Sequence, residues 1–189
     1  MIPSPNQTRR PPATFSLFAR VLHWSMAAGI LAMLFIGVGM VASVSERHQW
    51  LVQIHKPLGL ALLALVCIRL GRRVFKGAPA LPVDLPAWQR HAALASHVLL
   101  YALMFAMPLI GWAMLSAGGY PVVAAGWQLP PIAPADAALF SWLRGAHRYL
   151  AFLLLATVLL HLAAALFHGW VRRDGVLVSM TRGRSVSSR

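Results

Sequence analysis

Histidine is the residue type in this chain that most clearly points to chemistry. The sequence has eight histidines in 189 residues, and several of them fall inside long apolar segments. An ionisable side chain in such a segment is costly and rare, so it is by default a functional hypothesis. Binding of haem iron by a neutral imidazole is one of the few arrangements that justify it. These histidines therefore predict haem ligation.

The fourth apolar segment carries two histidines whose spacing is informative. His147 and His161 are fourteen residues apart. On an α-helix this distance is about four turns, so both side chains face the same way and lie about 21 Å apart along the axis. That separation suits two haems stacked through a membrane, one near each face.

Each of these two histidines has a partner expected at the same depth. His23 lies near the beginning of the first apolar segment, level with His161, and His55 lies near the beginning of the second, level with His147. The sequence thus predicts two bis-histidine sites, His23 with His161 for an inner haem and His55 with His147 for an outer haem. A single histidine on an apolar helix is more often a hydrogen-bonded packing residue, but four that match in pairs favour iron ligation.

Three roles are open for His97, which lies in the third apolar segment at about the depth of the inner pair. It could replace an inner ligand, bond a haem propionate, or line a quinone pocket. A quinone pocket near the inner haem would involve His97 or Trp112. The last two roles are favoured over ligation, because the spacing in the fourth segment already accounts for two sites. The remaining histidines fall at segment ends or in loops, where solvation at the membrane interface is the simpler interpretation: His48, His91 and His168. For His168, contact with a cytoplasmic haem propionate is also open.

The elements that must position these histidines are membrane helices. Hydrophobic residues make up 59% of the chain and charged residues 11%, and a soluble domain of this size could not hide so much apolar surface. The apolar residues form runs long enough to cross a bilayer core of about 30 Å. The predicted spans are residues 17–41, 50–70, 91–115 and 142–170. We therefore predict an all-α integral membrane protein, an up-down four-helix transmembrane bundle binding two haems b.

This bundle is expected to form one domain over residues 1–183, followed by a flexible cytoplasmic tail at residues 184–189. Its only cysteine, Cys67, excludes a two-cysteine haem attachment motif, so the haems would be bound non-covalently.

Lysine and arginine are distributed unequally between the two sides of such a bundle. If the chain crosses the membrane four times, thirteen of these residues share one side: Arg9, Arg10, Arg20, Arg69, Arg72, Arg73, Lys76, Arg90, Arg172, Arg173, Arg182, Arg184 and Arg189. The other side receives only Arg47, Lys56, Arg144 and Arg148. The positive-inside rule then predicts that both termini lie in the cytoplasm. This placement explains the net charge of +13 better than nucleic-acid binding does.

Several short motifs accompany the histidines. They read ARVLHW at 19–24, HKPLG at 55–59, SHVLLY at 96–101, PLIGW at 108–112 and HLAAALFH at 161–168. In these motifs the chain resembles bacterial cytochrome b561, specifically its superoxide oxidase branch, from about residue 15 to residue 183. The resemblance implies two haems b held by the four paired histidines and a multi-pass location in the bacterial inner membrane. Family members often have doubled histidines in the third and fourth spans, where this chain has Ser96–His97 and His168–Gly169.

The same resemblance implies a reaction. Superoxide oxidases oxidise superoxide at the periplasmic face and reduce ubiquinone, so we expect an oxidoreductase with superoxide, ubiquinone and the lipid bilayer as its partners. Lys56 and Arg148 directly follow the outer histidines, and Arg144 is close in sequence. Cations at these positions would steer the superoxide anion toward the outer haem. Alternatively, they anchor the helices at the interface or pair with haem propionates.

Two other functions remain open. A cytochrome b subunit that carries electrons between a periplasmic dehydrogenase or hydrogenase and the quinone pool would have the same helices and histidines, with that enzyme as its partner. A non-catalytic haem carrier, or a transporter with histidines in its path, is a third interpretation, but the sequence shows no pair of broken helices. The outer loop at 116–141 has few charges, which favours a stand-alone oxidase over docking of a large polar subunit.

Overall fold

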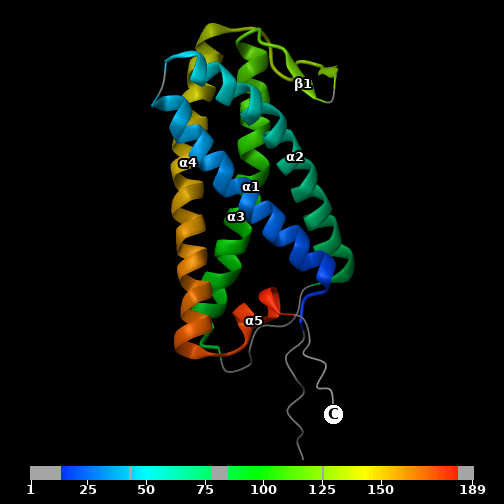
Figure 1. Cartoon of the computed structure of the whole chain (residues 1–189), viewed down its shortest axis with the longest axis vertical. Coiled ribbons are helices and arrows are strands. Elements are labelled where there is room, and N and C mark those ends of the chain that lie inside the picture. Colours follow the sequence, from blue (N-terminus) through cyan, green and yellow to red (C-terminus); the bar gives the residue numbers. More distant parts are fainter. Residues whose placement is uncertain (1–13, 43, 78–84, 125, 183–189) are drawn as a thin grey trace, which may run out of the picture.

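The computed structural model describes residues 14–42, 44–77, 85–124 and 126–182. The four long helices are α1 (Leu17–Val41), α2 (Glu46–Lys76), α3 (Ala87–Ala117) and α4 (Ala137–Leu166). They run up and down along the long axis of the molecule (Figure 1). The π-helix η1 (Phe167–Arg172) and the short helix α5 (Val176–Thr181) follow α4. An antiparallel hairpin of β1 (Val122–Ala124) and β2 (Trp127–Leu129) lies between α3 and α4.

All four long helices are long and apolar enough to cross a membrane. Large apolar side chains cover their outer surfaces; Phe35 of α1 and Leu160 of α4, for example, are 77% and 71% exposed. Lipid accepts such a surface, whereas water would not, because the apolar side chains would then have to be buried. The predicted four-helix membrane fold is confirmed.

The helix boundaries differ from the predicted spans in one consistent way. The first helix has the predicted bounds, whereas α2 and α3 begin and end beyond the predicted residues. The fourth begins before residue 142, and its helical backbone continues from α4 into η1 and ends at Arg172, beyond residue 170. Hydropathy marks only the part of a helix inside the hydrocarbon core, while backbone hydrogen bonding continues into the interface. The short elements β1, β2, η1 and α5 were not predicted. The predicted tail at 184–189 lies outside the described residues, as do Arg9, Arg10, Arg184 and Arg189.

The helices pack as two hairpins. α1 packs mainly on α2, α3 packs mainly on α4, and α2 joins the two hairpins through α3. Gly29 of α1 lets the first hairpin close tightly, because a Cβ atom there would stand 2.9 Å from Leu62 Cδ2. A small core of Leu22, Met26 and Val66, with Tyr101 packed against it, links α1, α2 and α3. Among the described residues, α1 and α4 pack on other helices rather than closely on each other.

The bundle has two distinct ends. At the inner end, in the lower part of Figure 1, α1 and α3 begin and α2 and α4 end, and α5 lies at the same end. At the outer end lie the α1–α2 connection and the β1–β2 hairpin. His48 Nδ1 is 2.8 Å from the carbonyl oxygen of Met40 and so closes the α1–α2 connection. The side chain of Asp136 caps α4 by accepting a hydrogen bond from the Leu139 amide at 2.6 Å. That the inner end faces the cytoplasm stays a prediction of the positive-inside rule.

Candidate functional site

The outer histidine pair joins the two hairpins near the outer end. His55 of α2 and His147 of α4 are both partly buried, and their ring centres are 6.2 Å apart with an interplanar angle of 64°. The Nδ1 atoms of both rings are buried and have no hydrogen-bond partner among the described residues. A buried imidazole nitrogen without a partner is costly, so this arrangement suits rings whose interactions are completed by a bound group.

The inner pair repeats this arrangement near the other end. His23 of α1 and His161 of α4 have ring centres 6.3 Å apart and an interplanar angle of 73°. His97 of α3 lies beside them, with its ring centre 5.5 Å from that of His161. Three imidazoles from three helices thus meet at the inner site.

Helix direction accounts for the pairing. α4 is helical from Ala137 to Leu166, so His147 and His161 lie on one side of it and about 21 Å apart along its axis. α1 begins at the inner end and α2 begins at the outer end. His23, near the start of α1, therefore lies at the level of His161, while His55, in the outer part of α2, lies at the level of His147. The structure brings together each pair that the sequence predicted; their role as ligands stays a prediction.

The ring separations test whether a haem fits. Two imidazoles on opposite sides of one metal ion, each bound at about 2 Å, would have their ring centres about 6 Å apart, and both observed separations agree with this. No group of three or more His, Cys, Asp or Glu residues in the described ranges could hold a metal ion. An ion held by two histidines would need its other ligands from a separate group, and a porphyrin supplies four of them in a plane.

Buried side chains separate the two pairs from the ends of the bundle. Leu51 and Leu143 are buried, and each lies one helical turn closer to the outer end than His55 or His147. Ala19 and Leu22 are buried beside His23 on the inner side. Each histidine pair therefore has buried apolar side chains between it and the nearer end of the bundle.

The predicted outer cations lie at the outer end, as the helix directions require. Lys56 is partly buried, while Arg144, Arg148 and Arg47 are exposed. The guanidinium of Arg148 stands over the ring of Tyr149, 5.0 Å from its centre, and donates a hydrogen bond to the Tyr149 hydroxyl at 3.3 Å. Among the described residues none of these four forms an ion pair with a carboxylate. Their positive field therefore remains available to an anion.

Two of the expectations for the remaining side chains were wrong. Trp112 does not approach the inner site: its indole N–H donates to the carbonyl oxygen of Pro130 in the outer loop at 3.1 Å. Trp112 lies fifteen residues after His97 on α3, which places it about 22 Å nearer the outer end. His168 is not simply solvated: its Nδ1 lies 2.5 Å from Asp174 Oδ2, and both side chains are largely buried. His91 is exposed, as expected for an interfacial residue.

Sequence reasoning also missed two inner residues. Arg69 of α2 lies close enough to His23 and His161 to interact with both electrostatically. Asp174 accepts a contact from Arg172 Nε at 3.3 Å as well as pairing with His168. Arg69 could have been found from its spacing, because it lies on the same helical face as Arg72 and Arg73. The Asp174 contacts follow from the chain reversal after η1, which has no comparable signal.

Comparisons with known proteins agree with the fold. Residues 14–183 match the family described as prokaryotic cytochrome b561. Cytochrome b561 homolog 2 of Escherichia coli is 30% identical over 180 residues, which cover 93% of this chain and 95% of that protein. The probable superoxide oxidase of Yersinia pestis is 31% identical over 132 residues, or 69% of this chain and 74% of its own length. The chain therefore belongs to the prokaryotic cytochrome b561 family, whose members are four-helix membrane proteins that bind haem b and transfer electrons.

Proposed function

We propose that this protein oxidises superoxide at the outer end and delivers the electrons to ubiquinone in the membrane. Each superoxide anion loses one electron and becomes O₂; two such electrons and two protons convert ubiquinone to ubiquinol. The observation that carries the proposal is the presence of two histidine pairs, one near each end of α4. When bound at these pairs, two b haems supply the one-electron relay between the two ends.

The residues at the outer end have the charge that such a donor requires. Lys56 and Arg148 directly follow the outer histidines, and Arg144 lies one turn before Arg148 on α4. A cluster of cations raises the local concentration of a small anion and speeds its arrival. Glu46 and Asp136 are the only acidic residues in the outer connections, and the side chain of Asp136 is used as a helix cap. These features support steering of superoxide by Lys56, Arg144 and Arg148.

The buried residues around the histidines support the same function. Leu51 and Leu143 cover the outer pair and limit the access of water while leaving electron transfer, which needs no direct contact, unhindered. At the inner site His97 lies 5.5 Å from His161. We place His97 at a haem propionate or in the ubiquinone site, where its N–H would donate a hydrogen bond to an acceptor oxygen.

One feature favours the second candidate, a cytochrome b subunit for a periplasmic dehydrogenase or hydrogenase. The β1–β2 hairpin and the outer loop expose Tyr120, Trp127 and Ile132, of which Trp127 is 77% exposed. Exposed aromatic side chains are common in protein interfaces, although Trp and Tyr also occur where a membrane protein meets the lipid headgroups.

Reduction by superoxide alone separates the two candidates. The haem-loaded protein in lipid nanodiscs, with no partner protein, is exposed to a calibrated flux of superoxide, and haem reduction is followed by absorbance. We expect reduction within the mixing time at physiological ionic strength, followed by turnover when ubiquinone is added. Superoxide dismutase should abolish both signals. Absence of reduction in a protein with full haem content would contradict the superoxide proposal and favour the subunit.

A further inference from the structure

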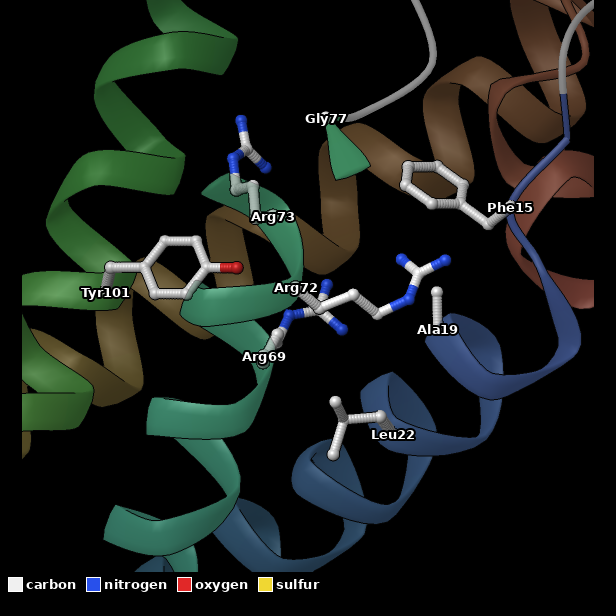
Figure 2. Close-up of a pocket in the computed structure, with 8 residues that line it drawn as sticks. All are labelled: Phe15, Ala19, Leu22, Arg69, Arg72, Arg73, Gly77 and Tyr101. Carbon is white, nitrogen blue, oxygen red and sulfur yellow. The ribbon is translucent and has the colours of Figure 1, made fainter. Parts of the chain in front are cut away.

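A small cavity at the inner end is lined by three arginines. Arg69, Arg72 and Arg73 of α2 surround it together with Tyr101 of α3, and α1 closes the opposite side with Ala19 and Leu22. Figure 2 shows Arg73 on the side of Tyr101 and Arg72 extending toward Ala19 and Phe15. The cavity measures about 30 Å³, which is room for one or two groups the size of a water molecule. We call it the arginine pocket.

Two of the three guanidinium groups, those of Arg72 and Arg73, are positioned by neutral partners. Arg72 donates a hydrogen bond to the Ser16 hydroxyl at 2.6 Å and stands over the Phe18 ring at 6.0 Å. Arg73 stands over the Tyr101 ring at 5.8 Å. No carboxylate in the described part of the chain forms an ion pair with Arg69, Arg72 or Arg73.

This arrangement concentrates positive charge on one helical face. Residues three and four apart on a helix are neighbours, and like charges in such pairs repel each other. The negative end of the α2 dipole offsets part of this repulsion. The guanidinium N–H groups of these arginines that are not used in the contacts above suit an oxyanion, since guanidinium groups bind phosphate and carboxylate through paired hydrogen bonds.

The position of the pocket in the bundle indicates which kind of oxyanion would fit it. Its rim includes Phe15, two residues before α1, and Gly77, the residue that ends α2. These are the levels at which the helices leave the hydrocarbon core and meet the headgroups. Large apolar side chains lie on the lipid side of this region, including Phe18 and Phe75, which are 57% and 88% exposed. A ligand with an anionic head at the pocket and hydrocarbon chains along these side chains fits both features.

We propose that the arginine pocket binds the phosphate of an anionic phospholipid headgroup. Arg72 and Arg73 at the rim contact the phosphate, Arg69 adds its charge from deeper in the pocket, and the acyl chains lie against Phe18 and Phe75. Basic pockets between membrane helices are known to hold acidic lipid headgroups in this way. The proposal concerns the retention of a lipid and not electron transfer, so its failure would leave the proposed reaction untouched.

Native mass spectrometry of the haem-loaded protein tests the proposal. The protein is released from nanodiscs containing equal amounts of phosphatidylglycerol and phosphatidylcholine, and the lipids retained per chain are counted. We expect one phosphatidylglycerol to be retained in preference to phosphatidylcholine. The double variant Arg72→Gln/Arg73→Gln should reduce this preference by on the order of tenfold, given the attraction that each basic residue contributes near an anionic surface.

A matched variant controls for charge. Lys76→Gln/Arg90→Gln removes two exposed cations from the same end but leaves the pocket intact, and it should keep the preference for phosphatidylglycerol. Arg73→Lys retains the positive charge but loses the planar guanidinium group, so it should partly lose the preference for phosphatidylglycerol. This variant keeps the test decisive if the double variant does not fold.

Four outcomes would overturn the proposal. The wild-type protein could show no preference for phosphatidylglycerol, or Arg72→Gln/Arg73→Gln could retain the preference in full. Inorganic phosphate at millimolar concentration could displace the signal as effectively as added phosphatidylglycerol, which would identify a soluble anion as the ligand. The fourth result, an altered haem reduction potential in Arg72→Gln/Arg73→Gln with lipid retention unchanged, would assign the arginines to a haem propionate instead.

Discussion

The imidazole rings of His55 and His147 lie 6.2 Å apart between α2 and α4, although the two residues are 92 positions apart in the sequence. The relationship arises because α2 and α4 both begin at the outer end and each carries its histidine in its outer half. It links the first helical hairpin to the second through side chains. If these rings hold the outer haem, removing either one should have the same consequence.

The first prediction follows from this pair. Replacing His147 with Leu should lower the haem content from two b haems per chain to one, because a single remaining imidazole cannot hold the iron in a low-spin, six-coordinate state. Replacing His55 should have the same effect. The pyridine haemochrome assay measures the content, and His91→Leu, at an exposed histidine of α3, serves as the control. A content of two haems in either pair variant would contradict the outer site.

A second prediction separates the inner site from the outer one. His161→Leu should also leave one haem per chain, but its reduction potential and low-temperature spectrum should match those of the haem lost in His147→Leu. The two single variants would then add up to the spectrum of the wild-type protein. Equal and partial loss of both haems from either change would argue against two independent sites.

The orientation of the bundle gives a third prediction. The basic residues at the inner end, among them Arg72, Arg73 and Arg172, place that end in the cytoplasm by the positive-inside rule. A fluorescent protein fused after the last residue should therefore fluoresce in a bacterial host, while alkaline phosphatase fused at the same point should be inactive. Active alkaline phosphatase would reverse the assignment of the two ends.

The fourth prediction concerns stability at the inner end. Asp174 is largely buried and contacts both His168 at 2.5 Å and Arg172 at 3.3 Å. Its replacement by Asn would leave the Arg172 guanidinium and the His168 ring with a weaker acceptor, at a cost of about 1–3 kcal/mol. A fall in the thermal unfolding midpoint in detergent would show this, with Glu46→Gln, at an exposed carboxylate, as the reference. Equal midpoints for the two variants would mean that the cluster does not stabilise the fold.

The histidine pairs could be predicted from the sequence because helical periodicity and alternating helix direction together fix the depth of a side chain. The prediction that Trp112 lies near the inner haem was wrong, because its position near the end of α3 places it at the outer end. His168 and Asp174 meet only because the chain reverses after η1, with Arg173 in a left-handed conformation at φ 51°. Hydrophobic periodicity carries no signal for such a turn, nor for strands as short as β1 and β2.

The last prediction tests what the outer cations do. Arg144 and Arg148 are four residues apart on α4 and exposed, so they present two charges on the face next to His147. If they steer superoxide, the rate of haem reduction should fall by on the order of tenfold between low salt and 0.5 M salt, where charges are screened within a few ångströms. Arg144→Gln/Arg148→Gln should reproduce most of this loss at low salt and flatten the salt dependence, with full haem content retained. Arg90→Gln/Arg173→Gln, which removes two charges at the inner end, should change neither quantity. Loss of a haem from Arg144→Gln/Arg148→Gln would instead make the two arginines structural partners of the cofactor. If the rate and salt dependence of this variant matched those of the wild-type protein, either Lys56 and Arg47 would carry the attraction or no steering would exist.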